Sequence, residues 1–69
     1  MFYLYLLTGS GARAHRMGAA EAFATVQAAL FAGLQHMKHA SAATGFEVVS
    51  KHGSPIWLHL DGKDTVWSK

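Results

Sequence analysis

No cysteine occurs in this chain of 69 residues, so a fold of this size is held together without a disulfide. A domain this small buries only about 60% of the surface that its unfolded chain exposes, which leaves it marginally stable. Its stability therefore has to come from a well-packed core, a histidine-bound metal or oligomerisation. We expect a single domain over residues 1–69, and the lack of thiols suits the reducing cytoplasm.

The charge content is low, with 14% charged residues and a formal net charge of +2. An average domain has roughly 25% charged residues, so this surface has to carry many neutral and apolar side chains, which favours an interface. A dedicated duplex-DNA binder usually carries a denser basic stripe. Residues 1–7 are apolar, but they lack the basic flank and the cleavage-like sequence of a signal peptide. No segment approaches the roughly 20 apolar residues that a membrane span needs. We expect a cytoplasmic protein with no membrane partner.

Two kinds of periodicity divide the first 40 residues. Residues 2–8 alternate as a strand, and residues 9–18, which include Arg13 and Arg16, show no apolar period and predict a mobile basic loop. From residue 19 to about residue 40 the chain is rich in alanine, with Glu21 in the first turn, and predicts a helix. Five residues form its expected core-facing stripe: Phe23, Val26, Leu30, Leu34 and Met37.

The remaining segment predicts a meander. Residues 46–51, 56–60 and 65–67 read as strands, and Asp61-Gly62 is a strong hairpin signal. The element order predicts an α+β fold of the type β-α-β-β(-β). In this fold an antiparallel sheet of three to four strands has one helix packed on one face.

A single helix leaves the other face of the sheet open. Alternation along residues 56–60 predicts that Leu58 and Leu60 face the helix and that Trp57 and His59 lie on the open face, next to Tyr3 and Tyr5. An aromatic open face is either ordinary cross-strand packing or a binding surface, because aromatic side chains dominate binding hot spots.

The sequence does not favour catalysis or a bound cofactor. The four carboxylates are scattered, and a layer of one helix on one sheet offers little depth for a catalytic pocket. His36 and His39 have helical spacing but no evident third ligand, so we expect no metal. The Gly9-Ser10-Gly11 segment is rich in glycine, as a phosphate-binding loop is. Such a loop requires a lysine followed by Ser/Thr at the start of the helix, and this chain has Met17-Gly18-Ala19 at that place. We therefore expect no enzyme and no cofactor.

The element order and the final residues resemble small phage-encoded anti-CRISPR proteins, in particular those that bind the Cascade-type surveillance complex of type I systems. The identities lie in the last dozen residues, at Ile56–Lys63 and Trp67. These residues form a pattern of a tryptophan, an alternating strand, an Asp-Gly-Lys turn and a second tryptophan. The resemblance implies a protein of the bacterial host cytoplasm that blocks target-DNA binding sterically. Of the family's basic helix residues only Lys38 remains, beside Gln35 and His39, and Lys63 matches in the hairpin.

We therefore expect a stoichiometric binding protein whose partner is a protein complex. The expected contact residues are Tyr3, Tyr5, Arg13, Arg16, Gln35, Lys38, His39, Lys51, Trp57, His59 and Lys63. Two alternatives stay open. One is a small nucleic-acid-binding module, in which sheet aromatics stack on bases while basic residues follow the phosphates. The other is a structural or assembly protein that forms a homodimer through its open sheet face.

Overall fold

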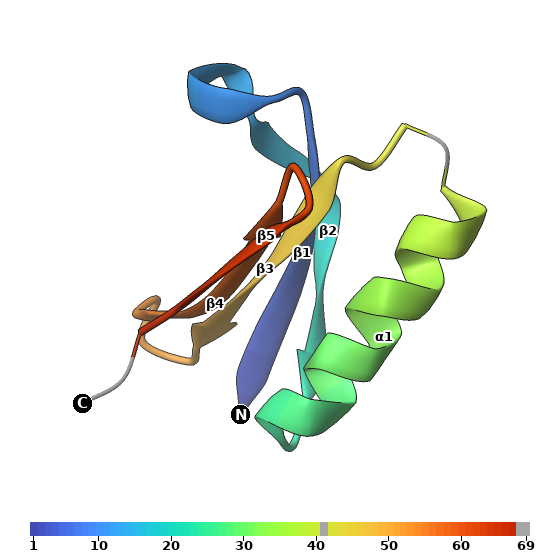
Figure 1. Ribbon diagram of the computed structural model, residues 1–69. Helices are drawn as coiled ribbons and strands as arrows, with labels where there is room; N and C mark the ends of the chain where they lie inside the picture. Colours follow the sequence, from blue (N-terminus) through green and yellow to red (C-terminus); the bar gives the residue numbers. More distant parts are fainter. Residues whose placement is uncertain (41, 68–69) are drawn as a thin grey trace.

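The computed structural model describes residues 1–40 and 42–67. Its elements follow the order β1 (Phe2–Thr8), a 3-10 turn η1 (Gly11–Arg13), β2 (His15–Phe23), α1 (Val26–His39), β3 (Gly45–Ser50), β4 (Pro55–Leu60) and β5 (Lys63–Val66). The strands form one antiparallel sheet in the order β2-β1-β3-β4-β5, with α1 on one side (Figure 1). The predicted α+β fold is confirmed, and the sheet has five strands.

The additional strand is β2, which corrects two predictions. Residues 15–18 are not a loop, and the helix starts at Val26 and not near residue 19. Pairing with β1 overrides the helix propensity of the Ala-rich segment, since tertiary context outweighs a weak local preference. The helix begins where Thr25 caps it, with the Thr25 hydroxyl accepting a hydrogen bond from the Ala28 N–H at 3.1 Å. Glu21 therefore lies on β2 and not in the first helical turn.

The core lies between α1 and the central strands β1 and β3. Its buried cluster consists of Leu4, Ala29, Phe46 and Val48. The helix approaches the sheet through its small residues, because a Cβ on Gly33 would lie 2.8 Å from the Phe46 ring. The predicted apolar stripe is therefore only partly right. Ala29 is fully buried, whereas Leu34 is 49% exposed.

The predicted facing of residues 57–60 on β4 is wrong. Trp57 pairs with Val48, and His59 pairs with Phe46, so both side chains lie on the helix side of the sheet. Leu58 pairs with Glu47 and points to the open face. Large side chains occupy both faces of β4, and a shift of one residue exchanges them, so alternation alone did not fix the register. A register shift between Val48 and Val49 sets which side chains of β4 face the helix.

The β4–β5 connection agrees with the sequence. Asp61 and Gly62 have φ angles of 54° and 77°, as a tight hairpin turn requires. This turn brings β5 antiparallel to β4, with Leu60 opposite Lys63. Within the described residues, the structure contains no helix of the length and apolarity needed to cross a membrane.

Candidate functional site: the open-face cleft

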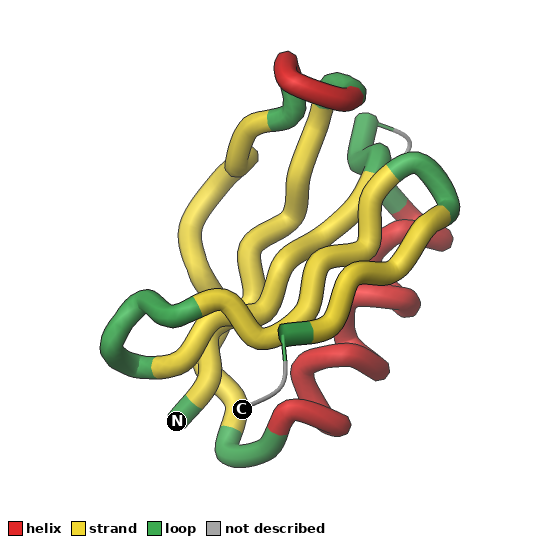
Figure 2. Tube along the Cα trace, turned by 60° about the vertical axis from the view of Figure 1, so that its left-hand side comes forward, coloured by secondary structure: helices red, strands yellow, loops and turns green. Residues whose placement is uncertain are grey.

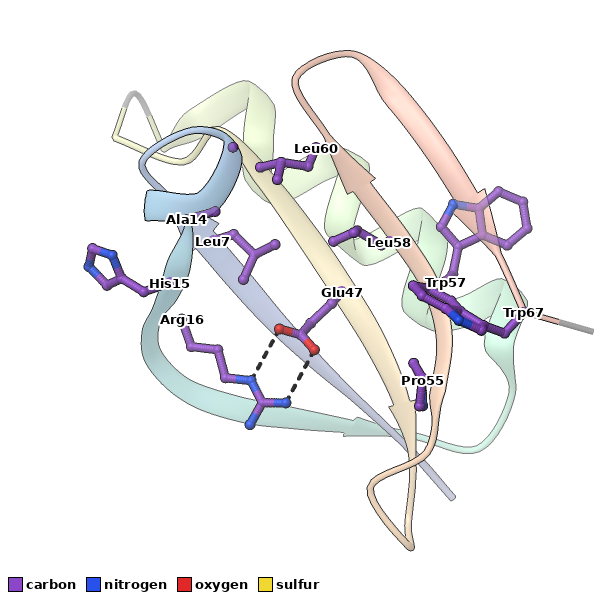
Figure 3. A pocket seen from close by; sticks show the side chains of 11 residues that line it. Leu7, Ala14, His15, Arg16, Glu47, Pro55, Trp57, Leu58, Leu60 and Trp67 are labelled. Atoms are coloured by element: carbon purple, nitrogen blue, oxygen red, sulfur yellow. Dashed lines mark hydrogen bonds and ion pairs between the residues drawn. The ribbon is translucent and has the colours of Figure 1, made fainter.

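The face of the sheet opposite α1 is hollowed into a cleft of about 440 Å³, which we call the open-face cleft (Figure 3). Segments far apart in the sequence form it: the ends of β1 and η1, the start of β2, the middle of β3, most of β4 and the residue after β5. Eleven residues line it: Leu7, Gly11, Ala14, His15, Arg16, Glu47, Pro55, Trp57, Leu58, Leu60 and Trp67.

The cleft is closed at one end by a contact between the two ends of the sheet. The Gly11 N–H donates a hydrogen bond to Asp61 Oδ2 at 3.2 Å, which joins η1 to the β4–β5 turn. The sheet is strongly twisted, so strands that are distant in its order curve toward each other (Figure 2). Leu7 is buried within the cleft, and Leu58 and Leu60 are half-buried beside it. The cleft therefore has an apolar floor.

An ion pair lies in the wall of the cleft. Arg16 Nε lies 3.1 Å from Glu47 Oε2, and Arg16 Nη2 lies 3.2 Å from Glu47 Oε1. The guanidinium also covers the Tyr5 ring at 3.8 Å from its centroid. The hydrogen bonding to Glu47 raises the pKa of Arg16. This two-point geometry fixes the guanidinium plane, and the charge of Arg16 is already matched by a carboxylate.

The other end of the cleft is aromatic. The Trp67 N–H donates a backbone hydrogen bond to the Ile56 carbonyl at 3.1 Å, which places the residue beside the start of β4. Its side chain remains 44% exposed, close to the exposed Pro55 (Figure 3). Trp57 also borders the cleft, although its register places its side chain toward the helix side. Trp67 is therefore the large aromatic group most available to a partner at this rim.

A second polar cluster lies on the helix side of β4 and β5. Asp64 Oδ1 accepts a hydrogen bond from Trp57 Nε1 at 3.0 Å and lies 2.8 Å from His59 Nδ1. His59 also stacks on Phe46, with ring centroids 5.3 Å apart. The hydrogen bonds from Trp57 and then from His59 lower the pKa of Asp64. The cluster links β5 to β4 across a short strand pair, so we assign it a structural role.

This cluster predicts a pH dependence of stability. Because the pKa of Asp64 is depressed below its usual value of 3.8, its contribution is fully present above pH 3.8. That contribution is lost as the pH falls through the lower pKa of the folded state. We expect the stability difference between the wild type and Asp64→Asn to shrink as the pH is lowered below 3.8. Thermal melts of both proteins across this pH range measure the stability difference. A difference independent of pH would contradict the structural role assigned to the Asp64 cluster.

The structure separates most of the predicted contact residues. Arg16 lies in the cleft wall over the Tyr5 ring, Trp57 borders the cleft, and Tyr3 lies on the same sheet face as Tyr5. The other seven residues lie elsewhere: Arg13 in η1, Gln35, Lys38 and His39 on α1, Lys51 in the β3–β4 turn, His59 on the helix side of β4, and Lys63 at the start of β5.

Several cleft residues were not predicted as contacts. Glu47 was not among the predicted contact residues, and Leu58 and Leu60 were predicted to face the helix. Leu7 was not predicted as a contact, and Trp67 was named only for the resemblance of the final segment. One signal was available, since residues 56, 58 and 60 are aliphatic and residues 57 and 59 are not. This pattern shows that β4 has two different faces, but it does not show which face the helix covers.

No protein-family model matches the chain, and neither the curated proteins nor the solved structures include a match. Among the residues that the structure describes, no group of three or more His, Asp or Glu side chains is placed to hold a metal ion.

Proposed function

We propose that the protein acts by stoichiometric binding of a macromolecular partner through the open-face cleft. The observation that carries this proposal is the composition of the cleft: an apolar floor, an exposed tryptophan at one rim and an ion pair in the wall. Binding sites commonly combine an apolar surface with a few fixed polar groups that orient the ligand. A partner side chain entering the cleft would bury apolar surface and meet an orienting charge pair.

The chemistry of the cleft favours binding over catalysis. Among the eleven described residues that line it there is no serine, threonine, cysteine or lysine to act as a nucleophile. Glu47 is held by Arg16, and His15 Nδ1 lies 3.2 Å from the Arg13 carbonyl at the exposed edge. A catalytic group has to reach a reacting atom with its proton or electron pair free. Glu47 and Arg16 are instead engaged with each other, and His15 lies exposed at the edge of the cleft.

The same geometry favours a protein partner over a nucleic acid. Base stacking requires free aromatic faces, and two of the aromatic residues expected to stack do not offer them, because the Tyr5 ring is covered by Arg16 and Trp57 lies toward the helix side. Arg16 would have to leave Glu47 to meet a phosphate. The other described cations are dispersed over four elements and turns, so they form no continuous phosphate track: Arg13, Lys38, Lys51 and Lys63.

As the partner we propose a type I CRISPR surveillance complex, whose capture of target DNA the protein would block. This choice rests on the resemblance of the final segment to anti-CRISPR proteins of that class. The same segment supplies much of the cleft, including Leu58, Leu60 and Trp67. The resemblance and the proposed contact surface thus fall on the same strands.

A mobility-shift titration tests this function. Purified type I complexes of several subtypes are incubated with increasing amounts of the protein and then with labelled target DNA. We expect the DNA shift to disappear at a fixed molar ratio of protein to complex and not to change further with time, because binding without turnover saturates.

The titration also tests the main alternative. The protein alone is mixed with DNA or RNA at several salt concentrations. If no complex is inhibited while the protein itself shifts nucleic acid with a steep salt dependence, the protein is a nucleic-acid-binding module and the proposed partner is wrong. Inhibition that grows with time at substoichiometric protein would instead identify an enzyme.

A further inference from the structure

The carboxylate of Glu47 lies in the middle of the open face of the sheet. Glu47 is opposite Tyr5 on β1 and opposite Leu58 on β4. Its side chain is 23% exposed, whereas that of its ion-pair partner Arg16 is 48% exposed. Arg16 is opposite Leu7 on the outer side of β1, so its side chain has to extend across β1 to reach Glu47 (Figure 3). The ion pair therefore spans three strands, β2, β1 and β3.

This ion pair occupies two groups of the cleft wall that a nucleic acid would use. A guanidinium group binds phosphate oxygens, and an aromatic ring stacks on bases. Glu47 holds Arg16 through Nε and Nη2 at 3.1 and 3.2 Å, and in this position the guanidinium lies 3.8 Å from the centroid of the Tyr5 ring. One carboxylate thus neutralises the cation and keeps it over the face of the ring.

We infer that Glu47 determines which class of macromolecule the open-face cleft accepts, because it holds Arg16 over Tyr5 and so excludes single-stranded nucleic acid. This inference rests on the proposed function, in which the cleft binds a protein. Specificity is a difference between two affinities, and a protein can achieve it by weakening the unwanted complex. The carboxylate also repels phosphate groups directly, so both effects of Glu47 act in the same direction.

The ion pair does not hinder a protein partner in the same way. An apolar side chain of the partner meets Leu58, Leu60 and Trp67, which lie outside the ion pair. The pair then forms a fixed polar wall of zero net charge, and no rearrangement is needed. For a nucleic acid, Arg16 first has to leave Glu47, which places an unpaired carboxylate beside the phosphates. The cost of keeping Glu47 therefore falls on the nucleic-acid complex.

Binding of labelled single-stranded DNA and RNA to the full chain, measured at several salt concentrations, tests this inference. We expect Glu47→Gln to bind roughly tenfold more tightly than the wild type, because the change releases one arginine for a phosphate and one ring for a base. The slope of log affinity against log salt should steepen by about 0.7 for each added phosphate contact. Glutamine has nearly the size of glutamate, and the half-exposed Arg16 stays hydrated, so the variant should fold.

The matched control is Glu21→Gln. It makes the same change of charge on β2, where Glu21 Oε1 lies 3.0 Å from His36 Nε2 of α1, outside the cleft. This variant should bind nucleic acid like the wild type. The double variant Glu47→Gln/Arg16→Gln has the net charge of the wild type but lacks the arginine, so it should lose the steeper salt dependence. Melting temperatures of all the variants show whether each one is folded at the temperature of the binding measurement.

Three results would each overturn the inference. Glu47→Gln and Glu21→Gln could bind nucleic acid equally, which would show that only net charge matters. The wild type could already bind as tightly as Glu47→Gln, or the double variant could keep the steeper salt dependence. These measurements need no surveillance complex, so the inference and the proposed function can fail separately. A wild type that inhibits no complex contradicts the proposed partner but does not change the comparison between the two glutamate variants.

Discussion

Replacing Phe46 by alanine should leave the protein largely unfolded at room temperature. Phe46 is 2% exposed and lies at the centre of the buried cluster, against Gly33 of α1 on one side and the His59 ring on the other. Removing a buried phenylalanine costs about 3–5 kcal/mol, because the lost burial is compounded by the cavity that remains. At about 0.05–0.15 kcal/mol per residue, a chain of 69 residues has a total stability of roughly 3–10 kcal/mol.

The expected loss is therefore comparable to the whole free energy of unfolding. Urea denaturation followed by circular dichroism measures it. The matched control is Phe31→Ala, since Phe31 is the same residue type on α1 but is 66% exposed. Its effect should stay within about 0.5 kcal/mol. If the two variants had similar midpoints, or if Phe46→Ala melted like the wild type, the packing of α1 on β3 described above would be wrong.

The parts of the fold that were predicted from sequence are those with strong local signals. The strand at residues 2–8, the β4–β5 turn and the presence of one helix all follow from periodicity and turn chemistry. The single-domain α+β class follows from these elements. Each signal is contained in a few neighbouring residues, so no knowledge of tertiary contacts is needed.

The errors occurred where tertiary contacts decide the outcome. Residues 19–23 have helix-forming composition, yet they extend β2 because β1 offers an edge to pair with. The facing of Trp57 and Leu58 depended on a register shift in β3–β4 that no local pattern encodes. Ala29 and Gly33 were not predicted as core because a hydrophobicity pattern favours large residues, whereas close helix–sheet contact requires small ones.

The candidate site was predictable only in part for the same reason. An open sheet face with aromatic side chains follows from having one helix and one sheet. The cleft itself depends on the twist of the sheet, on the contact between Gly11 and Asp61, and on the pairing of Arg16 with Glu47. The partners in these two pairs are separated by 50 and 31 residues along the chain, so no local pattern indicates that they meet.

We propose the open-face cleft as the surface that holds the partner, and Trp67 is the residue that tests this proposal. Its indole is 44% exposed at the rim of the cleft, so its truncation removes contact area without opening the core. Tryptophans at binding hot spots contribute about 2 kcal/mol or more, which corresponds to roughly a 30-fold change in affinity. Phe31 on α1 is an exposed aromatic residue outside the cleft and serves as the control.

The deciding measurement is the concentration of protein that abolishes target-DNA capture by a type I surveillance complex, compared for the wild type, Trp67→Ala and Phe31→Ala. We predict that Trp67→Ala requires roughly 30 times more protein and that Phe31→Ala matches the wild type. Equal melting temperatures for all three would show that the difference arises from the surface. If Trp67→Ala inhibits as well as the wild type while Phe31→Ala loses inhibition, the partner binds the helix and the role proposed for the cleft is wrong.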